Sequence, residues 1–268
     1  MRPTGNTLTW DRVCSISLLW NAPAVDQMNV VLRGIGRRLW ALLLRGSRFH
    51  CPLCAGNYRR FRTAGDPPRE NAVCPGCASL ERHRLLWMAL EKQWRKGALR
   101  VGDRMLHVAP EPVLAKKLEQ HFSEYVSIDL DGERAMKAMD VTALTFADRC
   151  FDAVVCNHVL EHVPDDRTAI AELYRVLKPG GWGSIQVPMK GDVTHEDPGV
   201  TDPQDRRRLY GQDDHVRQYG SDFIDRLRDA GFEVLILPKQ ELADPEKLDR
   251  LSVGCEDEVV LVTRPLGS

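Results

Sequence analysis

Four of the eight cysteines fall into two close pairs whose spacing suits metal binding. Cys51 and Cys54 are separated by two residues, as are Cys74 and Cys77, and nineteen residues lie between the pairs. Four thiolates can surround one Zn²⁺ as a closed tetrahedron that leaves no position for a substrate. So short a segment cannot build a large core, and a metal can replace one. The pattern predicts a structural zinc ribbon. A redox-active pair is disfavoured because neither C-x-x-C lies in a βαβ unit.

A second group of reactive side chains follows a short apolar segment. Residues 153–156 predict a strand, and Asn157 and His158 come directly after its end. A helix is expected next, because apolar residues recur at helical spacing. These residues are Ala169, Leu173, Val176 and Leu177. The helix should stop at Lys178-Pro179-Gly180-Gly181. Since ligands of parallel α/β sheets bind beyond the carboxyl ends of the strands, Asn157 and His158 are candidate site residues.

The elements that must position these residues alternate between strand and helix after residue 100. Strands are expected at 105–108, 125–130, 139–141, 151–156, 183–187, 233–237 and 259–263, and further helices at 113–121 and 221–230. Before them, a helix should begin at Ser79 as N-cap and end near Gly97. We therefore expect an N-terminal extension (1–49), a zinc ribbon plus helix (50–99) and a domain with a seven-stranded α/β sheet (100–268).

The segment FDAVVCNHVLEHV, followed by RVLKPGG, resembles the central motif of class I S-adenosylmethionine-dependent methyltransferases of the methyltransferase-11-like type. The resemblance implies a Rossmann-like sheet with helices on both faces and an antiparallel last strand. It also implies S-adenosylmethionine as cofactor. Asp129 would accept from the ribose hydroxyls, Asp140 would contact the adenine, and Asn157 would lie near the methyl group. A solvated turn carboxylate and a turn cap are the structural alternatives for Asp129 and Asp140. The full expected cofactor set is His107, Ala109, Glu111, Asp129, Asp140, Val141 and Asn157.

One segment departs from the family pattern. The first strand leads into His107-Val108-Ala109-Pro110-Glu111 instead of an acidic residue and a glycine-rich loop. His107 stands at the position of the family's first acid, and Glu111 could bind the cofactor's ammonium group. A branch of zinc-ribbon methyltransferases with a similar loop resembles this chain.

Three residues are candidates for a direct role in methyl transfer. His158 and His215 could act as general base, and Tyr219 is the third catalytic candidate. His215 and Tyr219 belong to residues 190–219, an irregular segment expected to cover the carboxyl edge of the sheet and bind the acceptor.

The net charge of −1 conceals an asymmetry. Residues 1–102 carry 17 Lys/Arg against 6 Asp/Glu, whereas residues 103–268 carry 20 against 32. The basic part could face nucleic acid or an anionic membrane, or pack on the acidic part. Residues 29–45 predict a basic amphipathic helix, which packs on its own protein or touches a membrane surface peripherally. The free-cysteine pattern favours a cytoplasmic protein, and no apolar stretch is long enough to span a bilayer.

These observations predict a methyltransferase that acts on a small-molecule, glycan or lipid-linked acceptor, at oxygen in preference to other atoms. An RNA methyltransferase that grips RNA with its basic ribbon is the first alternative. A zinc-dependent interaction module without catalysis is the second, because the glycine-rich loop is missing. The oligomeric state is not predicted.

Overall fold

A seven-stranded mixed sheet forms the centre of the computed structural model, which describes residues 39–65, 67–254 and 258–267. The strand order is β12-β13-β9-β8-β5-β6-β7. The bounds are β5 Arg104–Val108, β6 Glu124–Asp129, β7 Lys137–Ala138, β8 Phe151–Asn157, β9 Leu177–Gln186, β12 Glu233–Pro238 and β13 Glu258–Thr263. β5 to β9 run parallel, whereas β13 is antiparallel to both β9 and β12. The predicted Rossmann-like α/β fold and the antiparallel last strand are confirmed.

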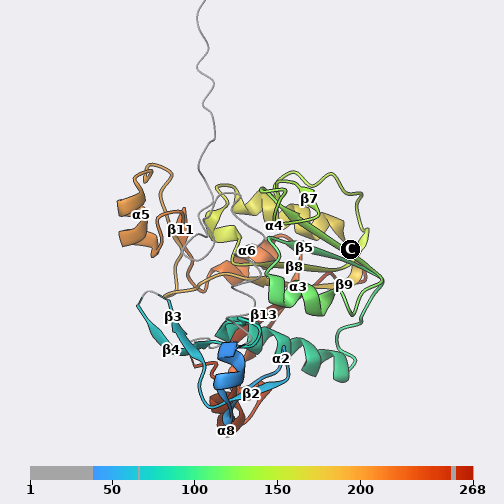
Figure 1. Cartoon of the computed structure of the whole chain (residues 1–268). Coiled ribbons are helices and arrows are strands. Elements are labelled where there is room, and N and C mark those ends of the chain that lie inside the picture. The colour runs from blue at the N-terminus through green and yellow to red at the C-terminus, as the bar shows by residue number, and fades with distance from the viewer. Residues whose placement is uncertain (1–38, 66, 255–257, 268) are drawn as a thin grey trace, which may run out of the picture.

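Helices cover both faces of this sheet (Figure 1). α2 (Glu81–Arg95) and α3 (Pro112–Leu118) pack on one face, and α4 (Asp166–Val176) and α6 (Phe223–Asp229) pack on the other. Successive residues of β5 point to opposite faces, with Met105 in the first apolar cluster and Leu106 in the second. This alternation follows from the two-residue period of a strand. The apolar residues of β5 and β8 are thus buried on the two faces of the sheet, and polar side chains follow at the carboxyl ends of these strands.

The cysteine-containing segment folds as two small hairpins. β1 (Arg45–Cys51) pairs with β2 (Gly56–Tyr58), and β3 (Arg62–Ala64) pairs with β4 (Arg69–Val73), both antiparallel. The buried guanidinium of Arg84 on α2 fastens this segment to the rest of the chain. It donates to the carbonyls of Ala72 (3.0 Å), Ser79 (2.8 Å) and Leu251 (2.6 Å).

The apolar core on the α2 face continues across residue 100. The buried Phe61 of the hairpins, Trp87 of α2 and Trp182 of β9 belong to one cluster. The rings of Trp94 and Trp182 lie 6.0 Å apart, and the Trp182 indole N–H donates to the Arg100 carbonyl at 2.9 Å. The hairpins and α2 therefore form one hydrophobic core with the sheet.

Several predicted boundaries are wrong, and each has a local reason. The helix N-cap is Leu80, not Ser79, because the Ser79 hydroxyl lies against the Cys51 sulfur at 3.2 Å. The short third strand is Lys137–Ala138, not 139–141. The Lys178–Gly181 segment was expected to be a break, but it belongs to β9. Gly180, with φ of 76°, absorbs the register shift between β8 and β9 there.

Residues 190–219 are more regular than expected. They contain α5 (Pro203–Tyr210), whose N-cap Asp202 accepts from the backbone N–H groups of Gln204 and Asp205. β10 (His195–Glu196) and β11 (Arg217–Gln218) pair antiparallel beside it. Two short helices also separate the last two strands, α7 (Lys239–Leu242) and α8 (Pro245–Leu251).

Most of the predicted 29–45 helix lies outside the described residues. Residues 39–43 are helical, and Leu39, Trp40, Leu42 and Leu43 are exposed. Among the described residues, no helix is both long and apolar enough to cross a membrane.

Candidate active site

A cavity of about 480 Å³ opens at the carboxyl edge of the sheet. It lies beyond the ends of β5, β8 and β9, and the first turns of α2 form its opposite wall. The polar side chains of its lining include Arg82, His83, Glu111, Asn157 and His158. Three of the predicted site residues, Glu111, Asn157 and His158, are thus brought together.

Glu111 is held in place by the histidine at the end of β5. His107 is fully buried; its Nδ1 lies 2.8 Å from the Tyr125 hydroxyl and its Nε2 lies 3.0 Å from one Glu111 oxygen. Burial would raise the pKa of Glu111, but the His107 hydrogen bond and the nearby His83 and Arg82 lower it to about 2. Glu111 is therefore a carboxylate at neutral pH. Among the predicted cofactor residues, His107 acts through Glu111 and does not line the cavity.

Several polar atoms at this cavity are buried without a hydrogen-bond partner. They are Nδ2 of Asn157, Nε of Arg82, the second oxygen of Glu111 and Nε2 of His83, and the last two face each other at 3.7 Å, beyond hydrogen-bond distance. Burial, assisted by the charge of Arg82, lowers the pKa of His83 to about 3, so this ring is neutral. Leaving a buried polar group unpaired costs about 1–3 kcal/mol, so such groups usually face a ligand. The cavity thus offers a carboxylate acceptor beside an amide and a guanidinium donor.

Two residues that follow sheet strands, Ala109 and His158, adopt a left-handed backbone conformation. Ala109, after β5, has a φ of 46°, and its N–H donates to the Ile128 carbonyl at 2.8 Å. Ala109 therefore adopts the left-handed turn that a glycine would take with less strain. His158 has a φ of 54°, and its N–H donates to the Gln186 carbonyl. The turn at His158 places it and Asn157 at the cavity, where the side-chain oxygen Oδ1 of Asn157 accepts from the Ser184 hydroxyl at 2.9 Å.

Asp129 and Asp140 lie at the same edge of the sheet but outside the cavity lining. Asp129 ends β6 and accepts from the backbone N–H of Asp131 at 2.9 Å. Asp140 is exposed and accepts from the backbone and side chain of Thr142, while the neighbouring Val141 is buried. Each aspartate keeps a second carboxylate oxygen available for a ligand.

His215 and Tyr219, the two catalytic candidates of the covering segment, occupy positions behind the cavity. His215 is buried, and its Nδ1 lies 3.0 Å from the Tyr210 carbonyl. Burial, with the charge of His162, lowers its pKa. Tyr219 is fully buried, and its hydroxyl donates to Asp166 at 2.5 Å.

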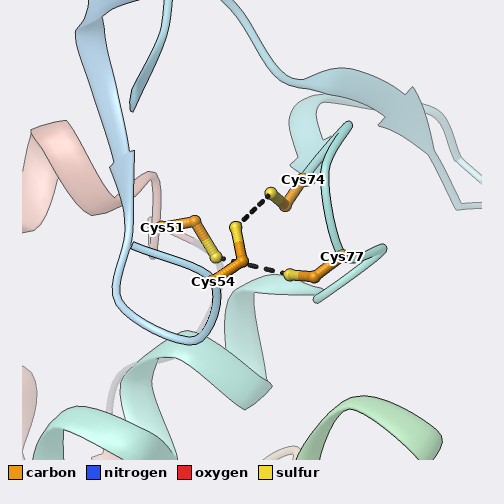
Figure 2. A group of neighbouring side chains, drawn as sticks. All are labelled: Cys51, Cys54, Cys74 and Cys77. Atoms are coloured by element: carbon orange, nitrogen blue, oxygen red, sulfur yellow. Dashed lines mark hydrogen bonds between the residues drawn. The ribbon is translucent and has the colours of Figure 1, made fainter. Parts of the chain in front are cut away.

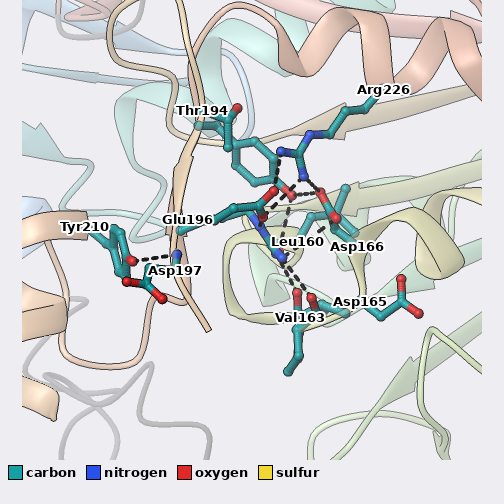
Figure 3. Close-up of polar contacts among 12 residues, drawn as sticks. Leu160, Val163, Asp165, Asp166, Thr194, Glu196, Asp197, Tyr210 and Arg226 are labelled. Atoms are coloured by element: carbon teal, nitrogen blue, oxygen red, sulfur yellow. Dashed lines mark hydrogen bonds and ion pairs between the residues drawn. The ribbon is translucent and has the colours of Figure 1, made fainter. Parts of the chain in front are cut away.

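Figure 3 shows the polar network that contains Asp166. Arg226 donates to Asp166 at 2.8 Å and to Glu196 at 2.7 Å, and Arg217 donates to Glu196 and to the carbonyls of Leu160 and Pro164. The hydrogen bonds from Arg226 and Arg217 lower the pKa of Glu196 to about 2, although burial opposes them. This network joins residues 190–219 to α4 and α6, and Tyr219 is a structural part of it.

The four cysteine side chains converge on one point (Figure 2). The sulfurs of Cys51 and Cys77 lie 3.5 Å apart, and those of Cys54 and Cys74 lie 3.7 Å apart. Four sulfurs around one zinc ion, each at about 2.3 Å, are separated by about 3.8 Å. The donor set and its spacing therefore fit a tetrahedral Zn²⁺.

The sequence interpretation missed several residues that the structure places at or behind the cavity. Arg82 and His83 went unassigned because α2 reaches the cavity only through tertiary packing. Glu161, His162 and Asp214 cluster beside His158 and His215. The sequence could have indicated Glu161 and His162, because His158, Glu161 and His162 have the H-x-x-E-H spacing that some zinc enzymes use to bind their metal.

The sheet order and the cavity at its carboxyl edge define a Rossmann-like α/β domain. Residues 99–185, from just before β5 to β9, match the family described as "Methyltransferase domain".

Curated relatives share short segments of the chain. A demethylmenaquinone methyltransferase of Streptomyces avermitilis is 52% identical over 46 residues, which are 17% of this chain and 20% of that protein. A ubiquinone/menaquinone biosynthesis C-methyltransferase of Xylella fastidiosa is 33% identical over 93 residues, 34% of this chain and 32% of that protein. The chain thus spans about a third or less of the length of these relatives.

Solved structures overlap with more of the chain at low identity. One is a putative methyltransferase from Bacillus halodurans, with 20% identity, a TM-score of 0.43 and coverage of 66% of this chain and 98% of that one. Another is the N-methyltransferase NodS from Bradyrhizobium japonicum, with 20% identity, a TM-score of 0.44 and coverage of 69% and 96%.

Proposed function

We propose that this chain is an S-adenosylmethionine-dependent methyltransferase whose reaction takes place at the cavity beside Glu111, Asn157 and His158. The observation that carries the proposal is the set of unpartnered buried polar atoms at the carboxyl edge of the sheet, within the segment that matches the methyltransferase family. When bound, the cofactor supplies a methyl group on a positively charged sulfonium.

The residues present suit the parts of this cofactor. The Glu111 carboxylate suits an ammonium group, and the Arg82 and Asn157 donors suit a carboxylate. The free oxygens of Asp129 and Asp140 suit ribose hydroxyls and the adenine amine. The protein's main task in methyl transfer is to align the acceptor and exclude water.

We further propose a hydroxyl-bearing small molecule, glycan or lipid-linked compound as acceptor. Of the three predicted catalytic residues, His158 lines the cavity, whereas His215 and Tyr219 do not. His158 is therefore the candidate base. A base at this point would accelerate transfer to a hydroxyl by about 10²–10⁴-fold. One curated relative is named as an O-methyltransferase, which agrees with transfer to oxygen. It is a ubiquinone biosynthesis O-methyltransferase of Thiobacillus denitrificans, 53% identical over 32 residues.

The four cysteines are proposed to hold one structural Zn²⁺. The sulfur separations support this assignment, and four protein ligands leave the ion no open position for a substrate. The ion would stabilise the two hairpins, which are too small to form a core without α2.

Calorimetric titration with S-adenosylmethionine and S-adenosylhomocysteine tests the main proposal. We expect one site per chain. Asp129→Ala should weaken binding by about 10–100-fold, because it removes hydrogen bonds to a charged acceptor. The neighbouring exposed Asp131→Ala is the matched control and should bind as the wild type does. Absence of heat with both nucleosides would refute the function, and normal binding by Asp129→Ala would refute the ribose assignment.

A further inference from the structure

A second cluster of potential metal ligands lies behind His158. Glu161 and His162 belong to the 3-10 helix η1 (Leu160–His162), and Asp214 and His215 belong to the turn between α5 and β11. Glu161, His215 and Asp214 are only 2%, 4% and 8% exposed. One donor atom each of Glu161, His162 and His215 lies within 4.8 Å of the others, and Nδ1 of His162 lies 3.4 Å from an Asp214 oxygen. Three side chains with nitrogen or oxygen donors therefore face one small volume, and Asp214 adjoins them through His162.

The donor atoms of this cluster lack hydrogen-bond partners. Oε2 of Glu161, Nδ1 of His162, both carboxylate oxygens of Asp214 and Nε2 of His215 are all buried and unpartnered. Buried polar atoms are normally paired, and buried carboxylates need a cation or several donors. The unsatisfied donor atoms of Glu161, His162 and His215, with the Asp214 carboxylate beside His162, are the arrangement that a bound cation would satisfy.

The surroundings prepare His215 to act as a ligand. Its Nδ1 lies 3.0 Å from the Tyr210 carbonyl, which can only accept, so the proton is on Nδ1 and the lone pair is on Nε2. A hydrogen bond from the remote ring nitrogen is the usual support of a metal-binding histidine. The backbone N–H of Val216 donates to the Glu161 carbonyl at 2.9 Å, which fixes the two ligand-bearing segments against each other.

We propose that Glu161, His162, Asp214 and His215 bind one divalent transition-metal ion, at a site separate from the four cysteines. Two imidazoles and two carboxylates favour Mn²⁺, Fe²⁺ or Zn²⁺, whereas Mg²⁺ and Ca²⁺ prefer oxygen donors alone. Ligands of a tetrahedral ion at about 2.1 Å are separated by about 3.4 Å, so the donor atoms, which lie within 4.8 Å of one another, must draw together when the ion binds.

The proposed site borders the cavity. The other Glu161 oxygen lies 3.5 Å from Nδ1 of His158, which lines the cavity wall. The ion would therefore link residues 190–219 to η1. Only the His158 side chain would separate the ion from an acceptor bound in the cavity. That placement beside an acceptor rests on the proposed function, whereas ion binding does not.

The test uses the full-length protein with its cysteine site saturated with zinc. Mn²⁺ is titrated while free Mn²⁺ is measured by electron paramagnetic resonance, and added Zn²⁺ is followed by competition with a chromogenic chelator. We expect one additional ion per chain and a higher thermal unfolding midpoint in its presence. His215→Gln and Glu161→Gln should each weaken binding at least about tenfold. His195→Gln, an exposed histidine of the same covering segment, is the matched control.

Binding of neither ion, or equal binding by the wild type and His215→Gln, would overturn the site. A fold control is the unfolding midpoint without added metal, which should be similar in the wild type and both variants. S-adenosylhomocysteine binding is measured on the same samples. If that nucleoside binds and the metals do not, only the metal site is refuted; the reverse result refutes only the methyltransferase proposal.

Discussion

At the scale of single residues, Glu111 is the candidate for recognising the ammonium group of the proposed cofactor. His107 places it, the surrounding positive and imidazole groups lower its pKa, and its second oxygen makes no hydrogen bond, although Nε2 of His83 lies 3.7 Å away. A buried carboxylate in this state is available for a cationic ligand group.

Glu111→Gln should therefore weaken S-adenosylhomocysteine binding by about 10–100-fold, because an amide cannot replace the charge in a hydrogen bond to an ammonium group. Isothermal titration calorimetry measures the change. Glu119→Gln, on an exposed residue at the end of α3, should leave the affinity unaltered. Wild-type affinity in Glu111→Gln would show that the ammonium group is bound elsewhere.

The sequence predicted the location of a residue, though not its role, where position along a strand determines that location. Glu111, Asn157 and His158 follow strand ends, and parallel strands bring their carboxyl ends to one edge. Glu161 and Asp214 were out of reach because their proximity depends on how the covering segment folds back onto η1. Ser79 was assigned as a helix cap from its type alone, but its hydroxyl contacts Cys51 instead.

At the scale of elements, the covering segment is held to the sheet by charge. Asp166 at the start of α4 is buried, and it receives hydrogen bonds from Arg226 and from the Tyr219 hydroxyl. Arg217 also lies 3.7 Å from it. Asp166 and Glu196 together thus offset two arginines that are themselves largely buried.

Asp166→Asn should lower the free energy of unfolding by about 1–3 kcal/mol, since it weakens the buried hydrogen bonds from Arg226 and Tyr219 while Glu196 still pairs with both arginines. Urea denaturation measures this value. Asp229→Asn is the control: its side chain is 70% exposed and pairs only loosely with Arg167, so its effect should stay below about 1 kcal/mol. A loss in Asp166→Asn no larger than in Asp229→Asn would contradict the role assigned to the network.

The element pattern of the domain was predictable because its strands are apolar, short and separated by helices. The exceptions arose where local signals conflict with tertiary structure. Lys178-Pro179-Gly180-Gly181 has the composition of a helix stop, but pairing with β8 continues through it as strand. The short helix α5 is strongly charged, so it offers no apolar period to detect.

At the scale of the whole molecule, the cysteine hairpins and the cavity are linked through α2. The chain passes from Cys77 directly into this helix, whose first turns supply Arg82 and His83 to the cavity wall. The same helix carries Arg84, which holds the hairpins to the carbonyl of Leu251.

Removal of the proposed cysteine-bound zinc should therefore destabilise the two hairpins and also weaken nucleoside binding. Treatment with a strong chelator is expected to release one zinc per chain from the cysteines, lower the thermal unfolding midpoint and reduce S-adenosylhomocysteine affinity. Metal analysis, calorimetry and differential scanning calorimetry provide the readouts, and restored zinc should reverse all three changes. Unchanged affinity in the zinc-free protein would show that α2 keeps its position without the ribbon.

The ring cluster between α2 and the sheet gives the molecule a built-in optical reporter. Trp87, Trp94 and Trp182 form a chain of edge-to-face contacts at 5.7 Å and 6.0 Å, and His121 stacks on Trp94 at 5.0 Å. Indoles held this close in a rigid, asymmetric arrangement give a characteristic near-ultraviolet circular dichroism signal. That signal depends on the helix staying against the strand, so the state of the interface can be followed in solution without an attached label.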